Sequence, residues 1–169
     1  CEDLWTPLPP STLLALNGAT VIVNPSASNE LVGKIDYRKQ LISSQSAKTL
    51  CAYIYASAGF GESTTDVVYG GHCLIYENGS LLKENKRFQL SSNTILADID
   101  LEKLKMDRIK MTTFRDSQKH VKEAIYREIS FDLEIVDFPL ERIIDAHPFV
   151  PQNKSERDLR CEEIFSIQT

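Results

Sequence analysis

The sequence lacks several features that mark specialised classes of protein. No apolar stretch reaches the roughly 20 residues that a membrane-spanning helix needs, so we expect no membrane partner. Basic residues are not in excess, because 19 Lys and Arg stand against 24 Asp and Glu, which argues against nucleic acid as a partner. With 42% hydrophobic and 25% charged residues, and only seven Gly and seven Pro, collagen-like and wholly disordered chains are excluded.

Cysteine is also sparse, and its spacing fits neither a disulfide framework nor a metal site. The four residues, Cys1, Cys51, Cys73 and Cys161, are widely separated and form no Cys-x-x-Cys pair. We interpret them as thiols in a reducing compartment, and we expect a cytoplasmic protein with no bound metal. The first residue is Cys rather than Met, so we expect a processed chain or a piece of a longer one.

What is present in the first half follows the pattern of an α/β protein. Apolar, β-branched segments at 19–23 and 52–58 predict buried strands, and residues 34–51 between them have a helical spacing of apolar positions. This order is typical of parallel α/β layering. A short helix is expected over 11–17, with Ser11 or Thr12 as its N-cap. Residues 59–71 hold four glycines and predict a long loop, a class that is often functional.

Later segments predict further elements. Asn78-Gly79 predicts the turn of a hairpin over 72–88, residues 94–100 predict a strand, and Asp100 is placed to cap a helix over 101–110. The alternating residues 129–138 predict an edge or antiparallel strand, and residues 155–169 predict a helix that starts at Ser155. Residues 111–169 carry more charge and fewer glycines, so we divide the chain at residue 110.

Several motifs taken together resemble a known family. CEDLWTP at 1–7, NPSAS at 24–28 and GESTTD at 61–66 resemble the glutaminase domain of glutamine-dependent NAD synthetases, which belongs to the nitrilase superfamily. HPFVP at 147–151 and RCEEIFSIQ at 160–168 resemble the segment that leads into the synthetase domain of that family. The resemblance implies that residues 1–110 are the second half of a four-layer αββα sandwich and that residues 111–169 are a linker arm. A half sandwich would expose a sheet face, so we expect the isolated chain to associate or aggregate.

The resemblance also implies a catalytic site. Nitrilase-type amidases use a Cys nucleophile, a Glu base and a Lys that stabilises the oxyanion. Cys1 takes the place of the nucleophile, and Glu2 supplies an oxyanion-binding backbone N–H and faces the amino group of glutamine. Ser28 takes the place of a residue that helps to hold the α-amino or carboxylate group, and Lys34 that of an Arg that meets the carboxylate. Lys cannot form the bidentate pair that Arg forms.

Simpler interpretations of two of these residues remain open. Ser28 fits a turn, and Lys34 fits the solvated start of a helix. The family's Glu base and catalytic Lys precede the Cys, so this sequence holds neither, and we expect the isolated chain to be inactive.

The implied reaction is hydrolysis of glutamine, through a thioester, to glutamate and ammonia, which is then used to amidate deamido-NAD to NAD. ATP, Mg²⁺ and deamido-NAD would belong to a synthetase domain of the same polypeptide, which we expect to be a homo-oligomer; we expect no cofactor in this chain. Two alternatives stay open. One is an amidase that uses Cys1 as an N-terminal nucleophile, and the other is a non-catalytic nitrilase-like assembly module.

Overall fold

The computed structural model describes residues 2–121, 126–134, 136–137, 139–144 and 146–168, so Cys1 lies outside the described residues. The chain forms two compact units, Cys1–Val136 and Asp137–Thr169. Among the described residues, the first unit holds a sheet and five α-helices, and the second holds one helix. The division of the sequence at residue 110 stays a prediction.

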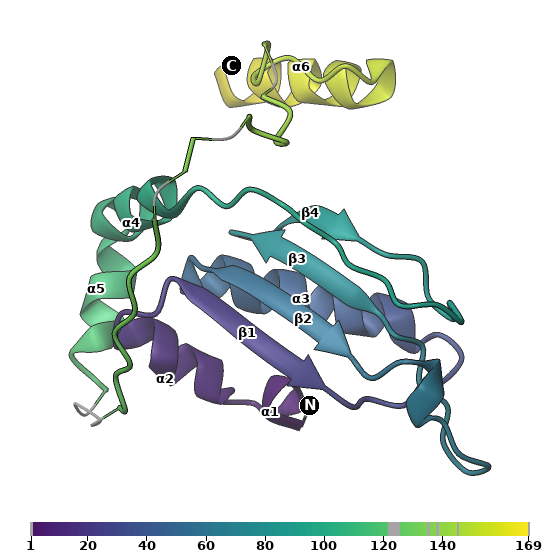
Figure 1. The fold of residues 1–169 in the computed structure, drawn as a ribbon. Coiled ribbons are helices and arrows are strands. Elements are labelled where there is room, and N and C mark those ends of the chain that lie inside the picture. The colour runs from purple at the N-terminus through teal and green to yellow at the C-terminus, as the bar shows by residue number, and fades with distance from the viewer. Residues whose placement is uncertain (1, 122–125, 135, 138, 145, 169) are drawn as a thin grey trace. The chain divides into compact units, whose positions relative to one another are not determined.

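Within the described residues, four strands form one sheet in the order β1-β2-β3-β4 (Figure 1). β1 (Val21–Ser26) pairs in parallel with β2 (Ala52–Ser57), and α3 (Lys34–Thr49) connects them. β3 (Cys73–Glu77) pairs antiparallel with β2, and β4 (Ser80–Glu84) pairs antiparallel with β3. This arrangement confirms the α/β class and the predicted strand–helix–strand order.

The β3–β4 hairpin turns at the predicted dipeptide. Asn78 and Gly79 have positive φ angles of 45° and 83°, which is the combination that a two-residue turn between right-twisted strands requires. Gly79 also lies close to α3, because a Cβ atom at this position would be 2.9 Å from the Cβ of Ala47. The turn therefore needs glycine for its conformation and for its contact with the helix.

Helices cover one face of the sheet. α1 (Glu2–Trp5), α2 (Pro10–Leu16) and α3 lie on that face, as Figure 1 shows. Side chains of α1, α3, the strands and the connection between α3 and β2 form the core: Leu4, Ile22, Ile42, Cys51, Tyr53, Tyr55, Leu74 and Tyr76. Residues that alternate with these point to the other face, where Val23 pairs with Ile54 and is 63% exposed. An apolar strand residue is thus left open on that face.

The N-terminus of α2 differs from the prediction. The helix begins at Pro10, and its N-cap is Pro9, which makes no side-chain cap. Proline suits the first turn because it lacks the N–H that would need a partner there. The hydroxyls of Ser11 and Thr12 instead accept hydrogen bonds from Nε2 of Gln45 in α3, at 3.0 and 2.9 Å. These two side chains join α2 to α3 rather than capping α2.

Two predicted strands are wrong in the described residues. Residues 94–100 form neither helix nor strand, and the backbone N–H of Asp100 donates to the Glu77 carboxylate at 2.7 Å. Residues 129–134, 136 and 137 also form no strand, and Ile129, Phe131 and Leu133 are exposed, while residues 135 and 138 lie outside the described part. An apolar or alternating segment becomes a strand only where a sheet edge pairs with it, and the described residues of these two segments pair with none.

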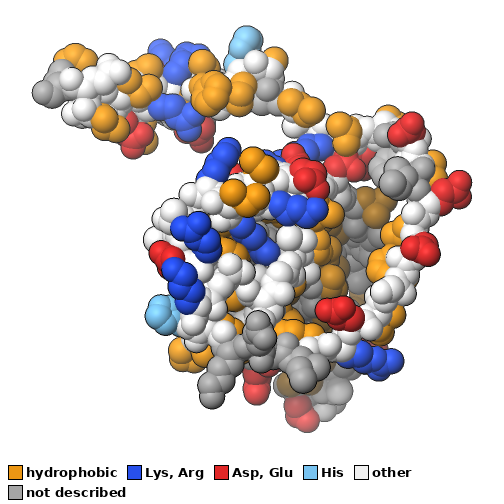
Figure 2. Space-filling view, turned by 90° about the vertical axis from the view of Figure 1, so that its left-hand side faces the viewer, with side chains coloured by type: hydrophobic (Ala, Val, Ile, Leu, Met, Phe, Trp, Pro, Cys, Tyr) orange, Lys and Arg blue, Asp and Glu red, His pale blue; other side chains and the backbone are white. Residues whose placement is uncertain are grey.

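The remaining helices follow the sequence more closely. Asp100 caps α4 (Leu101–Lys110) as predicted, since its side chain accepts from the backbone N–H of Lys103. α5 (Thr112–Gln118) follows, and Figure 2 shows Lys and Arg side chains gathered over these two helices. In the second unit, α6 (Lys154–Gln168) starts before Ser155, whose backbone N–H donates to Oδ1 of Asn153.

Candidate functional site

The candidate site lies where the parallel strands β1 and β2 end. In α/β sheets, ligands bind outside the carboxyl ends of such strands. Residues 27–33, which we call the β1 loop, follow β1, and residues 58–72, the β2 loop, follow β2 and include a 3-10 turn at Phe60–Glu62. A backbone hydrogen bond from Glu30 N to Val68 O joins the two loops, and one from Ala58 N to Ser26 O joins the β2 loop to the end of β1, both at 2.7 Å. They therefore form one rim.

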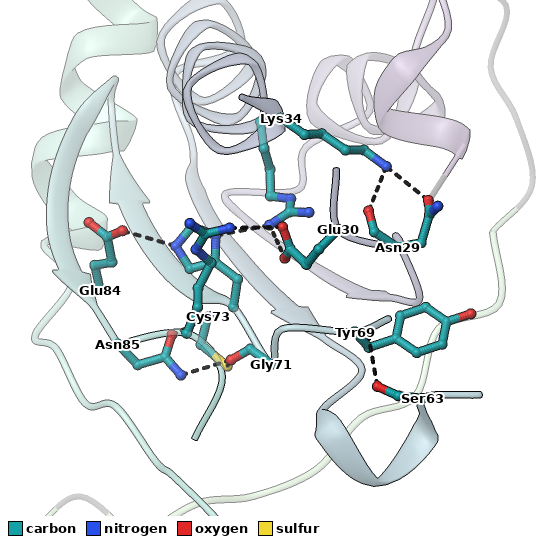
Figure 3. Close-up of polar contacts among 12 residues, drawn as sticks. Asn29, Glu30, Lys34, Ser63, Tyr69, Gly71, Cys73, Glu84 and Asn85 are labelled. Carbon is teal, nitrogen blue, oxygen red and sulfur yellow. Dashed lines mark hydrogen bonds and ion pairs between the residues drawn. The ribbon is translucent and has the colours of Figure 1, made fainter. Parts of the chain in front are cut away.

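Ser28 and Lys34 both lie in or next to the β1 loop. Ser28 is 3% exposed, so it faces inward rather than toward solvent. Lys34 is the first residue of α3, and its Nζ donates to the backbone O of Asn29 at 2.8 Å and to Oδ1 of Asn29 at 3.1 Å (Figure 3). Burial, followed by the nearby charge of Arg38, lowers the pKa of Lys34, and the charge of Glu30 opposes this shift. The Lys34 ammonium is thus held in place rather than freely solvated.

Helix α1 brings the start of the chain to this rim. The ammonium of Lys34 lies 5.1 Å from the ring centroid of Trp5. The ring of Trp5 packs against that of Tyr37, with 5.2 Å between the two ring centroids. Glu2, on the same short helix as Trp5, is exposed. The structure therefore brings Lys34 and α1 together, while Cys1 lies outside the described residues. The catalytic and binding roles of Cys1, Glu2, Ser28 and Lys34 stay predictions.

A buried charged network lies behind the β1 loop. Oε1 of Glu30 pairs with Nη1 of Arg38 at 2.8 Å, and Oε2 of Glu30 pairs with Nη1 of Arg87 at 2.9 Å. Nη1 of Arg38 also lies 3.1 Å from Nδ1 of His72, whose Nε2 is 2.9 Å from Oε1 of Glu84. Sequence reasoning missed this network, because its residues come from separate segments and form no motif.

The geometry fixes the protonation of His72. Arginine can only donate, so Nδ1 of His72 accepts from Arg38, and Nε2 carries the proton that is donated to Glu84. Burial is the main cause that lowers the pKa of His72, and the charge of Arg38 lowers it further. Burial alone would raise the pKa of Glu84, but the hydrogen bonds from Lys39 and His72 outweigh it and lower that pKa. His72 is therefore neutral, and both of its ring nitrogens are engaged within the protein.

A cavity of about 290 Å³ lies beside the β2 loop. Gly59, Gly71, Cys73 and Asn85 are among the described residues that line it, none of which is charged. Asn85 accepts from the backbone N–H of Cys73 at 2.7 Å and donates to the backbone O of Gly71 at 2.8 Å. Burial raises the pKa of the Cys73 thiol, which favours its neutral form. The cavity is suited to small, neutral, polar molecules.

No group of three or more His, Cys, Asp or Glu side chains in the described residues is arranged to hold a metal ion. No helix in the described ranges is both long and apolar enough to cross a membrane.

Known proteins resemble the chain in sequence. The family model described as Carbon-nitrogen hydrolase matches residues 1–108. The Glutamine-dependent NAD(+) synthetase of Mycobacterium tuberculosis is 42% identical over 172 residues, which cover 99% of this chain and 25% of that protein. The enzyme of the same name from Dictyostelium discoideum is 29% identical and covers 89% of this chain and 22% of its own length. The chain thus spans about a quarter of these curated relatives.

Solved structures resemble it in fold. A carbon-nitrogen hydrolase from Helicobacter pylori aligns with a TM-score of 0.57 and 20% identity, over 69% of this chain and 43% of that one. Saccharomyces cerevisiae Nit3, a member of the nitrilase superfamily, aligns with a TM-score of 0.54 and 22% identity, over 65% of this chain and 39% of that one. At this level of identity the likeness shows the fold alone.

Proposed function

The chain belongs to the carbon-nitrogen hydrolase family and has a nitrilase-superfamily fold, and from this premise we propose that it is the Cys-bearing part of a glutamine-dependent NAD synthetase. The observation that carries the proposal is the 42% identity with enzymes of that name over 99% of the chain. Because the chain spans 25% of those relatives, the rest of such a polypeptide has room for a synthetase domain.

The proposed reaction begins at Cys1. Its thiolate attacks the side-chain carbonyl carbon of glutamine, an S–C bond forms, and the backbone N–H of Glu2 stabilises the oxyanion. The C–N bond then breaks, and the leaving amine takes a proton and departs as ammonia. Water hydrolyses the thioester to glutamate and restores the thiol. A Glu base and a Lys from another part of the polypeptide would complete this site.

Two residues of the rim are proposed to bind the α-carbon end of glutamine. The buried Ser28 would hold the α-amino or carboxylate group, and the Lys34 ammonium, held by Asn29, would meet the carboxylate as a point charge. The ammonium is held by two acceptors on one residue, so its position is defined before glutamine arrives.

Ammonia is proposed to pass to the synthetase domain, which would use ATP and Mg²⁺ to amidate deamido-NAD. We place the whole protein in the cytoplasm and propose that it is a homo-oligomer.

The test is to compare glutamine with ammonium as nitrogen donor in the full-length polypeptide. We expect Cys1→Ala to abolish NAD formation from glutamine and to preserve NAD formation from ammonium. Full glutamine-dependent activity in Cys1→Ala would contradict the proposal and favour an assembly module. Glutamine hydrolysis by the isolated chain that is lost when the α-amine of Cys1 alone is blocked would favour an N-terminal nucleophile instead.

A further inference from the structure

We propose that Glu30 is a positioning residue that locks the β1 loop to the β2 loop and thereby sets the affinity of the site for glutamine. This inference rests on the proposed function. Glu30 has no part in the predicted chemistry and would act through its contacts with the β2 loop and with Arg38 and Arg87.

Glu30 is the point at which four segments meet. Its backbone N–H donates to Val68 O in the β2 loop, and its two carboxylate oxygens pair with Arg38 of α3 and with Arg87 beyond β4. Gly70 of the β2 loop lies close to the same carboxylate, since a Cβ atom added there would lie 2.7 Å from Oε1 of Glu30. The side chain is 5% exposed, so both oxygens are engaged inside the protein and are not offered to a ligand.

The charges of this cluster depend on one another. Arg38 is fully buried, so its guanidinium relies on Glu30 for a counter-charge. The same Nη1 of Arg38 that pairs with Glu30 also donates to Nδ1 of His72, which is itself held by Glu84. Glu30 therefore attaches the β1 loop to a side chain that cannot easily move. Removing the Glu30 charge would leave a buried cation without its counter-ion and would release the loop.

The attached loop carries the residues proposed to bind glutamine. Ser28 lies two residues before Glu30, and Asn29, its direct neighbour, holds the ammonium of Lys34. A shift of the backbone at Glu30 would move all three groups. The effect should thus fall on glutamine binding, and the synthetase reaction with ammonium should be untouched.

The experiment uses the full-length polypeptide and the variant Glu30→Gln, which keeps the size of the side chain and removes its charge. We expect the KM for glutamine to rise about tenfold or more, because hydrogen bonds to charged groups are the strong ones. We expect kcat to fall much less, and NAD formation from ammonium to stay at the wild-type rate.

Glu77→Gln is the matched control. Glu77 is a buried carboxylate of the same unit, on β3, and it accepts from the backbone N–H of Asp100, which precedes α4. We expect its KM for glutamine to match that of the wild type. An unchanged KM in Glu30→Gln, or an equal rise in both variants, would overturn the inference.

A second pair of variants serves if Glu30→Gln does not fold. Arg87 is the partly exposed partner of Glu30, so Arg87→Gln removes one ion pair of Glu30 without changing a core residue. We expect a smaller rise in KM, about threefold, and recovery in Arg87→Lys, which keeps the charge. A wild-type KM in Arg87→Gln would then overturn the inference. Absence of glutamine use in the wild-type polypeptide would overturn the proposed function and, with it, this inference.

Discussion

Arg38 donates a hydrogen bond to Nδ1 of His72 over 3.1 Å, and both side chains are fully buried. The pair is compatible only with neutral His72, because a proton on Nδ1 would face an N–H of the guanidinium. Glu84 and Lys39 stand on the far side of His72, and Glu30 stands beyond Arg38. The protonation of His72 is thus linked, through Arg38, to Glu30, which holds the β1 loop.

The first prediction concerns pH and stability. The folded state lowers the pKa of His72, so the unfolded chain binds a proton at higher pH than the folded one does. The stability that neutral His72 contributes is therefore fully present above about pH 6.5, the pKa of unfolded His, and is lost as the pH falls below it. We expect the free energy of unfolding, measured in urea, to fall between about pH 7.5 and 5.5.

The variant His72→Gln gives the control for this prediction. Glutamine can accept from Arg38 and donate to Glu84 but does not titrate. We expect its pH slope over the same interval to be shallower. The same slope in both proteins would rule out His72 as the cause.

The second prediction concerns Arg108 of α4. Its guanidinium donates to the backbone O atoms of Ala19 at 2.7 Å, and of Thr49 and Leu50 at 3.0 Å, so it joins the end of α3 to the chain that enters β1. We expect Arg108→Met to lower the free energy of unfolding by about 3 kcal/mol, because three partly buried carbonyls lose a charged donor. Thermal unfolding measures this, and Lys110→Met, an exposed change on the same helix, should have little effect.

The third prediction concerns Lys34 and glutamine. We expect Lys34→Met in the full-length polypeptide to raise the KM for glutamine about tenfold, since the site loses the charge proposed to meet the carboxylate. Lys34→Arg should keep the affinity, because Arg supplies the same charge with a fork. Lys48→Met, an exposed change near the other end of α3, is the control. An unchanged KM in Lys34→Met would exclude the carboxylate role.

The fourth prediction concerns the hairpin turn. Gly79→Ala should lower stability by about 1 kcal/mol or more, because the position has a positive φ and its Cβ would press on Ala47. Gly61→Ala is the control, since a Cβ there meets nothing within 4 Å. Equal melting temperatures for the two variants would contradict this account.

Local signals in the sequence were sufficient for some elements. The Asn78-Gly79 turn, the Asp100 cap and helix α3 depend on residues that are neighbours in the chain, and all three are confirmed. Ser11 and Thr12 misled as caps because their partner, Gln45, comes from another helix.

Elements that need a distant partner could not be predicted. The alternation at 129–138 gives the faces of a strand but not an edge to pair with, and the described residues there are unpaired. The candidate site shows the same difference between local features and contacts among distant segments. The position of Lys34 at the start of α3 follows from the sequence, whereas the cluster of Glu30, Arg38 and Arg87 forms only when α3 and the segment after β4 meet at the β1 loop.

The contact between Gly70 and Glu30 has a consequence for how the β2 loop can vary. Gly61 has open space around it, so other residues can replace it without disturbing its neighbours. Gly70 has no such freedom, since any side chain would displace the Glu30 carboxylate from its arginines. In a library that randomises this loop and selects for growth on glutamine, position 61 should diversify while position 70 returns to glycine.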